Sequence, residues 1–468
     1  MVSFYFILFL LLFTGIGIYS FRKKKNNSAD YLLASSSVSP FFSGISAAAS
    51  TFSGFMFTGF VGYIFVNGLS AIWFIFFMFL GEFLSTNFNK YIKLYTKKTK
   101  ALTYIELITN LAGGYDFLRK LFAVIVVIFL GTYASSQILS STKALHEILN
   151  WNTYLSVVVA TVIILAYSLS GGIRASIWTD VAQAIIMLIA ISVLGYFSIQ
   201  NIGGFSSLYN ELKIVDPDLV AIYPKNLKFG IFAFALGWFF HGMGLLGQPH
   251  VMNRYMALKD ARNNSKKASW YFIIFSILFT TLLVIVSLAI RVHYSNASFD
   301  QELALLRFSK DMFSDFFLGL ILAGLFSSTI STADSQVLVC SSTLIRDLFS
   351  KFVSDKHALF WNKAATFAIA IFIALIALYG SKSVFTVVVT SWSVLAVAFT
   401  PFLLLGLLKQ KTAKTTALIM VLCGVTTTIL WQQNGLDKHG IASFFPGLIA
   451  SLTTYLVFNV LGFNKTPV

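Results

Sequence analysis

The residues best suited to chemistry lie in a polar run inside an otherwise apolar stretch. Between residues 326 and 336 most side chains are Ser, Thr, Asp or Gln, with Ser331, Thr332 and Asp334 near the centre. Hydroxyl and carboxylate oxygens are the ligands that hard cations such as Na⁺ prefer. Membrane Ser and Thr also bond to carbonyls of their own helix, but that explains one or two hydroxyls and not a whole run with an acid. The run therefore predicts a cation site.

Acidic residues within apolar stretches are costly and usually functional. Glu82, Asp180 and Asp334 lie clearly within such stretches, and Asp315 lies near the end of one. We expect Asp180 at the cytoplasmic start of a helix, where it either attracts or holds a cation or caps the helix N-terminus.

Two apolar stretches are interrupted by small or helix-breaking residues. One contains the small residues of 43–54, and the other contains the glycines of 237–247 followed by Pro249. Such interruptions in two separated membrane helices indicate a transporter site, because unwound backbone exposes carbonyls and amides. Close packing of helices through small residues is the alternative. We favour a transporter because the two stretches lie five spans apart.

The composition is that of a membrane protein. Of 468 residues, 57% are hydrophobic and 11% charged, and the mean hydropathy is +0.80. Soluble domains are about 45–50% apolar and about 25% charged. A spanning helix needs roughly 20 apolar residues, and we predict an all-α polytopic protein with about 13 of them. The predicted spans are 2–21, 40–66, 68–90, 119–148, 153–170, 176–199, 228–247, 267–291, 313–345, 359–379, 384–407, 414–432 and 441–463.

Basic residues predict how these helices are oriented. With the N-terminus outside and the C-terminus cytoplasmic, 25 of the 34 Lys and Arg residues fall in predicted inner loops, as the positive-inside rule requires. The net charge of +16 is therefore attributed to orientation and not to nucleic-acid binding. The basic cluster at 22–25 follows the first helix, whereas a signal peptide has its basic residues first. We expect that helix to be retained, a short surface helix over 103–115, and a long outer loop at about 200–227.

The sequence carries no enzyme motif that we recognise. It lacks H-E-x-x-H, G-x-S-x-G and a phosphate-binding loop. Cys340 and Cys423 form neither a disulfide framework nor a metal motif. We expect no enzyme activity. A secondary transporter and a sensor built on a transporter fold remain, and we favour the transporter because we recognise no signalling domain in the sequence up to Val468.

Four motifs make the chain resemble the sodium:solute symporter family, and within it the bacterial sodium/proline symporters. They are 46–54 in the second span, 176–183 at the start of the sixth, 247–257 around the seventh and 331–348 in the ninth. The motifs keep their order between about 40 and 350, whereas the last part of the chain fits by topology alone.

The resemblance implies the LeuT fold with an extra first helix and alternating access. The expected organisation is one transmembrane transporter domain over 1–468. Its parts are the extra helix at 2–21, a first repeat at 40–199, an inverted second repeat at 228–407, and two C-terminal helices at 414–463.

The resemblance also implies the residues that bind ions. The main Na⁺ site would use the carbonyls of Ala49, Phe52 and Ser328 and the hydroxyls of Ser331 and Thr332. Candidates for a second Na⁺ site or the ion's exit route are Asp180, Asp334 and Ser335, with Ser331 shared between the two sites.

The substrate pocket departs from the family pattern. Ser53, Gly54 and Tyr133 match pocket positions of proline carriers. A Trp and a Tyr of those carriers fall here on His241 and Leu245, and an Asp falls on Thr51. We expect a substrate carboxylate to bind the free amides of the broken second helix, with the other end of the solute facing His241 and Leu245.

The resulting expectation is a Na⁺-coupled symporter that imports a small organic solute, an amino acid such as proline. Its partners would be that solute, Na⁺ and the lipid bilayer, with no nucleic acid, no obligatory protein partner and no cofactor besides the coupling ion. The expected location is the plasma membrane, the inner membrane of a bacterium. The alternatives are a carrier of another carboxylate, such as sialic acid, pantothenate or a monocarboxylate, and a sensor module.

Overall fold

The computed structural model describes residues 1–20, 28–169, 172–225, 227–295, 298–350, 352–353 and 357–465. Within these ranges the chain forms helices and no strand, apart from one isolated bridge between Val38 and Leu258. The all-α prediction is confirmed. The basic cluster at 22–25 lies outside the described residues.

The helices follow one another closely along the chain. The first half contains α1 (Val2–Ser20), α2 (Ser28–Leu33), α3 (Pro40–Thr51), α4 (Val61–Asn67), α5 (Ala71–Ser85), α6 (Asn89–Thr99), α7 (Tyr104–Leu111), α8 (Asp116–Ile125), α9 (Gly131–Leu149), α10 (Thr153–Ser168), α11 (Gly172–Ile202) and α12 (Phe205–Val215). The second half contains α13 (Gly230–Met243), α14 (Pro249–Met256), α15 (Arg262–His293), α16 (Ala304–Met312), α17 (Asp315–Thr343), α18 (Ala358–Tyr379), α19 (Val384–Leu407), α20 (Lys414–Gln433) and α21 (Phe444–Val460). Short turns of other helix types include η3 (Met56–Phe60), η6 (Val126–Leu130), η8 (Gly244–Gly247), η9 (Gln301–Leu303) and η10 (Leu344–Leu348).

Each predicted span coincides with a helix or with helices joined end to end. Among the described residues, nine helices are long and apolar enough to cross a membrane, and three shorter apolar helices lie at Val2–Leu12, Thr153–Ser168 and Phe444–Val460. The exact number of crossings stays a prediction.

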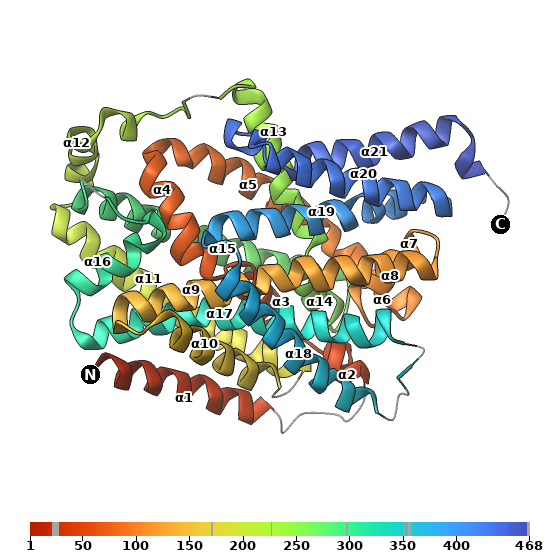
Figure 1. Ribbon diagram of the computed structural model, residues 1–468, viewed down its shortest axis with the longest axis horizontal. Helices are drawn as coiled ribbons and strands as arrows, with labels where there is room; N and C mark the ends of the chain where they lie inside the picture. Colours follow the sequence, from red (N-terminus) through yellow and green to blue (C-terminus); the bar gives the residue numbers. More distant parts are fainter. Residues whose placement is uncertain are drawn as a thin grey trace.

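The helices run mostly along the long axis of the molecule (Figure 1). Helices α12 and α16, from segments predicted to lie outside, are found at one end, and α6 and α7 lie at the other. Helix α1 packs at the edge against α11 and α17, while α20 and α21 pack together on the opposite edge. The predicted grouping of loops is thus present, and which end faces the cytoplasm stays a prediction.

Helix α17 forms the centre of the molecule. In its most apolar window 89% of the residues are buried, against 33% in the corresponding window of α20. Helix α17 is therefore surrounded by protein, whereas α20 has many side chains exposed on the surface of the bundle. It contacts α3, α9, α11 and α18. The polar run of the sequence is therefore enclosed by other helices and is not exposed to the bilayer.

Both predicted interruptions are present. Helix α3 ends at Thr51, and the next residue, Phe52, leaves helical geometry with φ −83° and ψ 77°. In the second interrupted span, α13 passes through η8 to an extended Gln248 (φ −99°, ψ 98°) before α14 begins at Pro249. Proline suits the first turn of a helix because it has no amide hydrogen to leave unpaired.

Glycines beside the second break serve close packing as well. A Cβ on Gly242 of α13 would lie 1.9 Å from Met78 O, and one on Gly81 of α5 would lie 1.9 Å from Phe239 O. A Cβ on Gly247 would lie 2.4 Å from Ala396 Cα on α19. Close packing therefore explains these glycines. The backbone break at Gln248 is a separate feature of the same segment.

The segment 103–115 is not the surface helix that we expected. Helix α7 packs against α8, α14 and α19, and its Tyr104, Leu107 and Ile108 are fully buried. The Tyr104 hydroxyl donates to the carbonyl of Leu246 beside the second break. The hydrophobic face of α7 makes it part of the core.

A charged cluster around Glu302 joins three segments near the end that carries α16. The Glu302 carboxylate accepts from Lys143 Nζ of α9 at 2.6 Å and from the backbone amides of Val384 and Phe385 at 3.0 and 2.9 Å. These amides belong to the first turn of α19, which has no helical acceptors for them. Glu302 is buried, so one carboxylate satisfies both a nearly buried cation and a helix end.

We expect Glu302→Gln to lower the stability of the protein by about 2 kcal/mol. It removes the buried one of the two carboxylates that bind Lys143, and the other, Asp300 at 2.7 Å, is about half exposed. The measurement is the midpoint of thermal unfolding in detergent. The matched control is Asp218→Asn, which breaks an ion pair with Lys225 whose two side chains are 62% and 57% exposed and should cost about 1 kcal/mol or less. Equal losses in the two variants would contradict this role of Glu302.

Candidate functional site

The break after α3 frees backbone carbonyls. Ser53 N donates to Thr51 O at 3.0 Å and not to Ala49 O, its partner in a continuous helix. Ala49 O instead accepts from Ser331 Oγ of α17 at 2.9 Å. The first broken helix is thereby joined to the polar run of α17.

The next carbonyl is freed in the same way. Gly54 N donates to Gln137 Oε1 of α9 at 2.9 Å, which leaves Ser50 O without its helical donor. Thr332 Oγ1 lies 3.2 Å from Ser50 O and 3.5 Å from Ala49 O. Two adjacent hydroxyls of α17 therefore face two adjacent carbonyls of α3.

A further carbonyl of α17 completes the cluster. Ser331 Oγ lies 3.1 Å from Ser328 O. The structure thus brings together the predicted residues Ala49, Ser328, Ser331 and Thr332, and it adds Ser50. Phe52, the remaining predicted ligand, forms the break itself, and its ring packs 5.5 Å from that of Phe279.

These oxygens suit a cation of low charge. Carbonyls are acceptors alone, and a hydroxyl can rotate to direct its lone pairs at an ion in place of its hydrogen. All members of the cluster are buried, and non-helical backbone at membrane depth is tolerated where it lines such an enclosed site.

Asp180 of α11 forms a buried ion pair that the sequence analysis did not anticipate. Its Oδ2 lies 3.2 Å from the guanidinium of Arg254 on α14, and both side chains are almost fully buried. The same oxygen accepts from Ser46 Oγ of α3 at 2.5 Å and lies 3.4 Å from Ser50 Oγ. Its other oxygen, Oδ1, has no hydrogen-bond partner among the described residues.

Arg254 connects four helices. It donates to Ser46 on α3 and Ser176 on α11 at 3.3 and 3.1 Å, to the carbonyl of His250 within α14 at 2.6 Å, and to Ser335 on α17. A planar guanidinium with five donors suits such a junction, whereas a lysine does not. Arg254 is one of the 25 basic residues that the sequence assigns to predicted inner loops, whereas the structure buries its side chain in this junction.

The other candidates for a second ion site lie beside this junction. Ser335 Oγ lies 3.1 Å from Ser50 Oγ and donates to Ser331 O at 2.6 Å, so it joins the Arg254 junction to the oxygen cluster. Asp334 is buried and lies within electrostatic reach of Arg254 and Asp180. Helix α11 begins at Gly172, too far before Asp180 for the helix-capping alternative.

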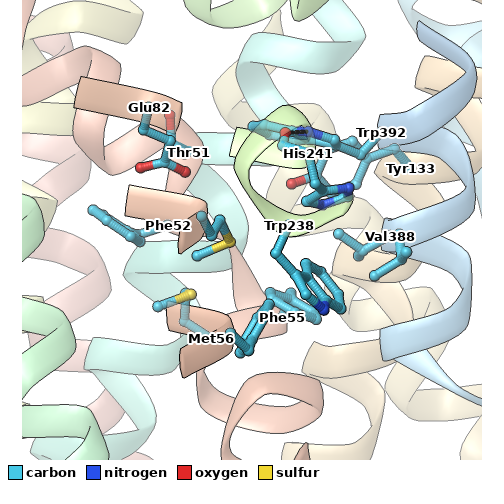
Figure 2. Close-up of a pocket in the computed structure, with 13 residues that line it drawn as sticks. Thr51, Phe52, Phe55, Met56, Glu82, Tyr133, Trp238, His241, Val388 and Trp392 are labelled. Carbon is cyan, nitrogen blue, oxygen red and sulfur yellow. Dashed lines mark hydrogen bonds between the residues drawn. The ribbon is translucent and has the colours of Figure 1, made fainter. Parts of the chain in front are cut away.

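A pocket lies beside the break in α3. It is lined by Thr51, Phe52, Phe55, Met56, Phe74, Met78, Glu82, Tyr133, Trp238, His241, Val388, Val389 and Trp392. Figure 2 shows these side chains converging from several helices. Its volume is about 50 Å³, which is room for a few water molecules. In this conformation the pocket is therefore contracted.

The structure places some predicted pocket residues on its wall and others behind it. Tyr133 and His241 line the pocket. Ser53 lies against the Tyr133 side chain, and Gly54 is held close to Ser140, whose Oγ donates to Gly54 O at 3.1 Å. Leu245 is buried in η8 and is not part of the lining.

The amides of the broken helix are not free, contrary to our expectation. Gly54 N is taken by Gln137, and Phe55 N lies 3.3 Å from Ser53 Oγ. Met56 N donates to Ser53 O at 2.9 Å. In this conformation a carboxylate would have to displace these partners, Gln137 first.

The pocket has aromatic walls although His241 and Leu245 stand where proline carriers have a Trp and a Tyr. Trp238 and Trp392 flank His241, with ring centroids 5.2 and 5.9 Å from the imidazole, and Trp392 Nε1 donates to His241 O at 3.0 Å. Sequence reasoning missed both tryptophans. Trp238 precedes His241 by one turn, which placed it on the same helix face, whereas no local signal points to Trp392.

Comparison with known proteins identifies the family of this chain. The profile of the sodium:solute symporter family matches residues 31–424.

This chain belongs to the sodium:solute symporter family.

Relatives of this symporter include the osmoregulated proline transporter OpuE and the high-affinity proline transporter PutP of Bacillus subtilis, both 27% identical. The alignments cover 99% of this chain and 94% of OpuE, and 95% of both this chain and PutP. The sodium/proline symporter of Escherichia coli is 25% identical over 97% of this chain and 91% of its own length. Transport coupled to Na⁺ is thus the activity of the family, and the protein is not an enzyme.

Solved structures show the fold of the symporter. A Na⁺-coupled sialic acid symporter in a substrate-bound outward-open state matches with a TM-score of 0.82 and 16% identity, over 97% of this chain and 98% of that one. A nucleobase-cation-symport-1 family transporter in a closed conformation matches with a TM-score of 0.55 and 12% identity, over 94% and 96%. The predicted LeuT-type architecture is confirmed.

The buried ion pair of the symporter gives a test by paired substitution. We expect Asp180→Asn and Arg254→Gln each to lower stability by about 3 kcal/mol, because each leaves the opposite charge buried and unpaired. The double variant should lose less stability than the sum of the losses in the two single variants. Thermal unfolding in detergent measures the three variants, and strictly additive losses would show that the two side chains are not coupled.

Proposed function

We propose that this symporter imports a small amino acid together with Na⁺ by alternating access, and proline is the first solute to test. The observation that supports Na⁺ binding at a defined place is the convergence of carbonyl and hydroxyl oxygens at the break in α3. Ala49 O, Ser50 O and Ser328 O meet the hydroxyls of Ser331 and Thr332 there. Unwound backbone carbonyls are a known means of Na⁺ coordination in transporters of this architecture.

The adjacent pocket supports a solute bound beside the ion. Thr51 and Phe52, which end α3, line the pocket, while Ala49 and Ser50 in the last turn of the same helix face α17. Occupation of either site would therefore act on one short segment of backbone, which is a physical basis for coupling. The contracted volume supports a conformational change before or upon solute binding.

The contacts around Arg254 support the proposal that the ion's route is closed on one side of the oxygen cluster. The Arg254 junction ties α3, α11, α14 and α17 together with side chains that are buried. In our proposal it lies between the oxygen cluster and the cytoplasm, and the free Oδ1 of Asp180 receives the departing ion.

The ion site is tested with Ser331→Ala and Thr332→Ala. We expect each to raise the Na⁺ concentration for half-maximal uptake about tenfold, equivalent to about 1.4 kcal/mol, because each removes one oxygen ligand. The assay is uptake of radiolabelled L-proline into proteoliposomes under an imposed Na⁺ gradient.

The matched control for these variants is Ser341→Ala on the same helix. Ser341 is equally buried, and its hydroxyl bonds to Leu338 O of its own helix at 3.1 Å, whereas Ser331 and Thr332 also reach carbonyls of α3. It should leave the Na⁺ dependence unchanged. Wild-type Na⁺ dependence in both Ser331→Ala and Thr332→Ala, or uptake driven by a proton gradient alone, would refute the proposed site.

A panel of solutes tests the substrate in the same assay. L-proline is compared with sialic acid, pantothenate and pyruvate, which represent the other carboxylates that the family resemblance leaves open. If a Na⁺ gradient drives uptake of one of these solutes and not of proline, the proposal of Na⁺-coupled symport stands and the proposal of an amino-acid substrate is refuted.

A further inference from the structure

The pocket contains an acidic side chain that the proposed ion site does not use. Glu82 lies in α5, is 4% exposed, and lines the pocket. Its Oε2 has no hydrogen-bond partner among the described residues, and none of the described ion pairs includes Glu82. A buried, charged carboxylate without a partner is strongly unfavourable. Glu82 therefore either carries a proton or meets a positively charged group from outside the protein.

Close helix packing fixes the position of this carboxyl. Glu82 follows Gly81, at the point where α5 touches α13. On the other helix, a Cβ on Gly242 would lie 2.9 Å from Glu82 N. The backbone at Glu82 therefore has little freedom to move away from the pocket. Figure 2 shows the carboxyl beside Thr51 at the pocket wall.

The described residues around this carboxyl offer it no Lys or Arg side chain. The described residues that line the pocket include no Lys or Arg. Thr51 Oγ1 is engaged with Ala47 O at 2.8 Å and does not serve Glu82. Glu82 also borders a second cavity of about 200 Å³ between α5 and α15, whose other lining residues are apolar except Ser276.

The walls of the pocket suit an organic cation. The rings of Phe74 and Trp238 lie 4.3 Å apart, and Trp238, His241 and Trp392 continue the aromatic surface. A cation within about 6 Å of such ring faces is attracted by their electron density. A second Na⁺ would need several oxygen ligands, which this wall of rings does not supply.

We propose that Glu82 binds the positively charged nitrogen of the transported solute, with the rings of Trp238 and Tyr133 around it. This inference rests on the proposed function and narrows it to solutes that carry a cationic nitrogen, such as zwitterionic amino acids and betaines. His241, whose Nδ1 also lacks a partner among the described residues, lines the same pocket and can donate to the carboxylate of such a zwitterion.

The first test replaces the charge and keeps the shape. Full-length Glu82→Gln protein in proteoliposomes is compared with wild type for uptake of radiolabelled L-proline and glycine betaine. We expect KM for the transported zwitterion to rise by about thirtyfold or more, with the Na⁺ dependence retained. Glu211→Gln, the same change at an exposed position of α12, is the matched control and should behave as wild type.

The second test needs no variant and covers the case in which Glu82→Gln does not fold. L-Proline is compared with tetrahydrofuran-2-carboxylate, and glycine betaine with 3,3-dimethylbutanoate, as competitors for uptake by the wild type. Each pair shares its shape and carboxylate and differs in the cationic nitrogen. We expect the nitrogen compound of the recognised pair to compete and its partner not to compete.

Several outcomes would overturn the role of Glu82. These are an unchanged KM in folded Glu82→Gln, a changed Na⁺ dependence with unchanged KM, equal competition within a recognised pair, and uptake restricted to solutes without a cationic nitrogen, such as pyruvate. If a Na⁺ gradient drives no uptake at all, the proposed function fails. Equilibrium binding of the paired compounds to the detergent-solubilised protein then still decides the role of Glu82.

Discussion

The structure depends on one constraint, which is that a helix broken inside a membrane must satisfy its freed backbone groups within the protein. Where α3 ends at Thr51, two carbonyls lose their helical donors, and Ser331 and Thr332 of α17 replace them. The amide of Gly54 is taken by Gln137 of α9. The break thus couples three helices through polar contacts, and the oxygen cluster and the pocket are the two sides of that break.

The buried acidic residues of the protein differ in whether a basic side chain is paired with them. Asp180 is paired with Arg254 and surrounded by serine hydroxyls, so the pair is satisfied and joins four helices. Glu302 is paired with Lys143 and also caps α19. Glu82 has no ion-pair partner among the described residues, and its Oε2 accepts no hydrogen bond from them. Since all these groups lie in poorly hydrated surroundings, the one that stays unpaired is the one best placed to meet a group from outside the protein.

Small residues have two separate effects in this fold. In α3 the run around Ala49 and Ser50 lets the helix lie close to α11, α15 and α17, where its freed carbonyls can be reached. At the crossing of α5 and α13, Gly81 and Gly242 allow backbone contact and so bring Glu82 to the pocket wall. Close packing and site formation are therefore parts of one arrangement and not competing explanations.

The sequence by itself determined the membrane class, the helical ranges and the two interruptions, because these follow from local hydrophobicity and from residues that disfavour helix. It also singled out Ser331, Thr332 and Asp180 as candidate site residues, since polar groups inside apolar segments stand out. The sequence did not determine which side chains contact one another between helices. Arg254 appeared to be a loop charge, Trp392 gave no signal, and Gln137 occupies an amide expected to be free. Only the tertiary structure decided these contacts, because they join residues from separate helices whose distance and rotation depend on the packing of the whole bundle.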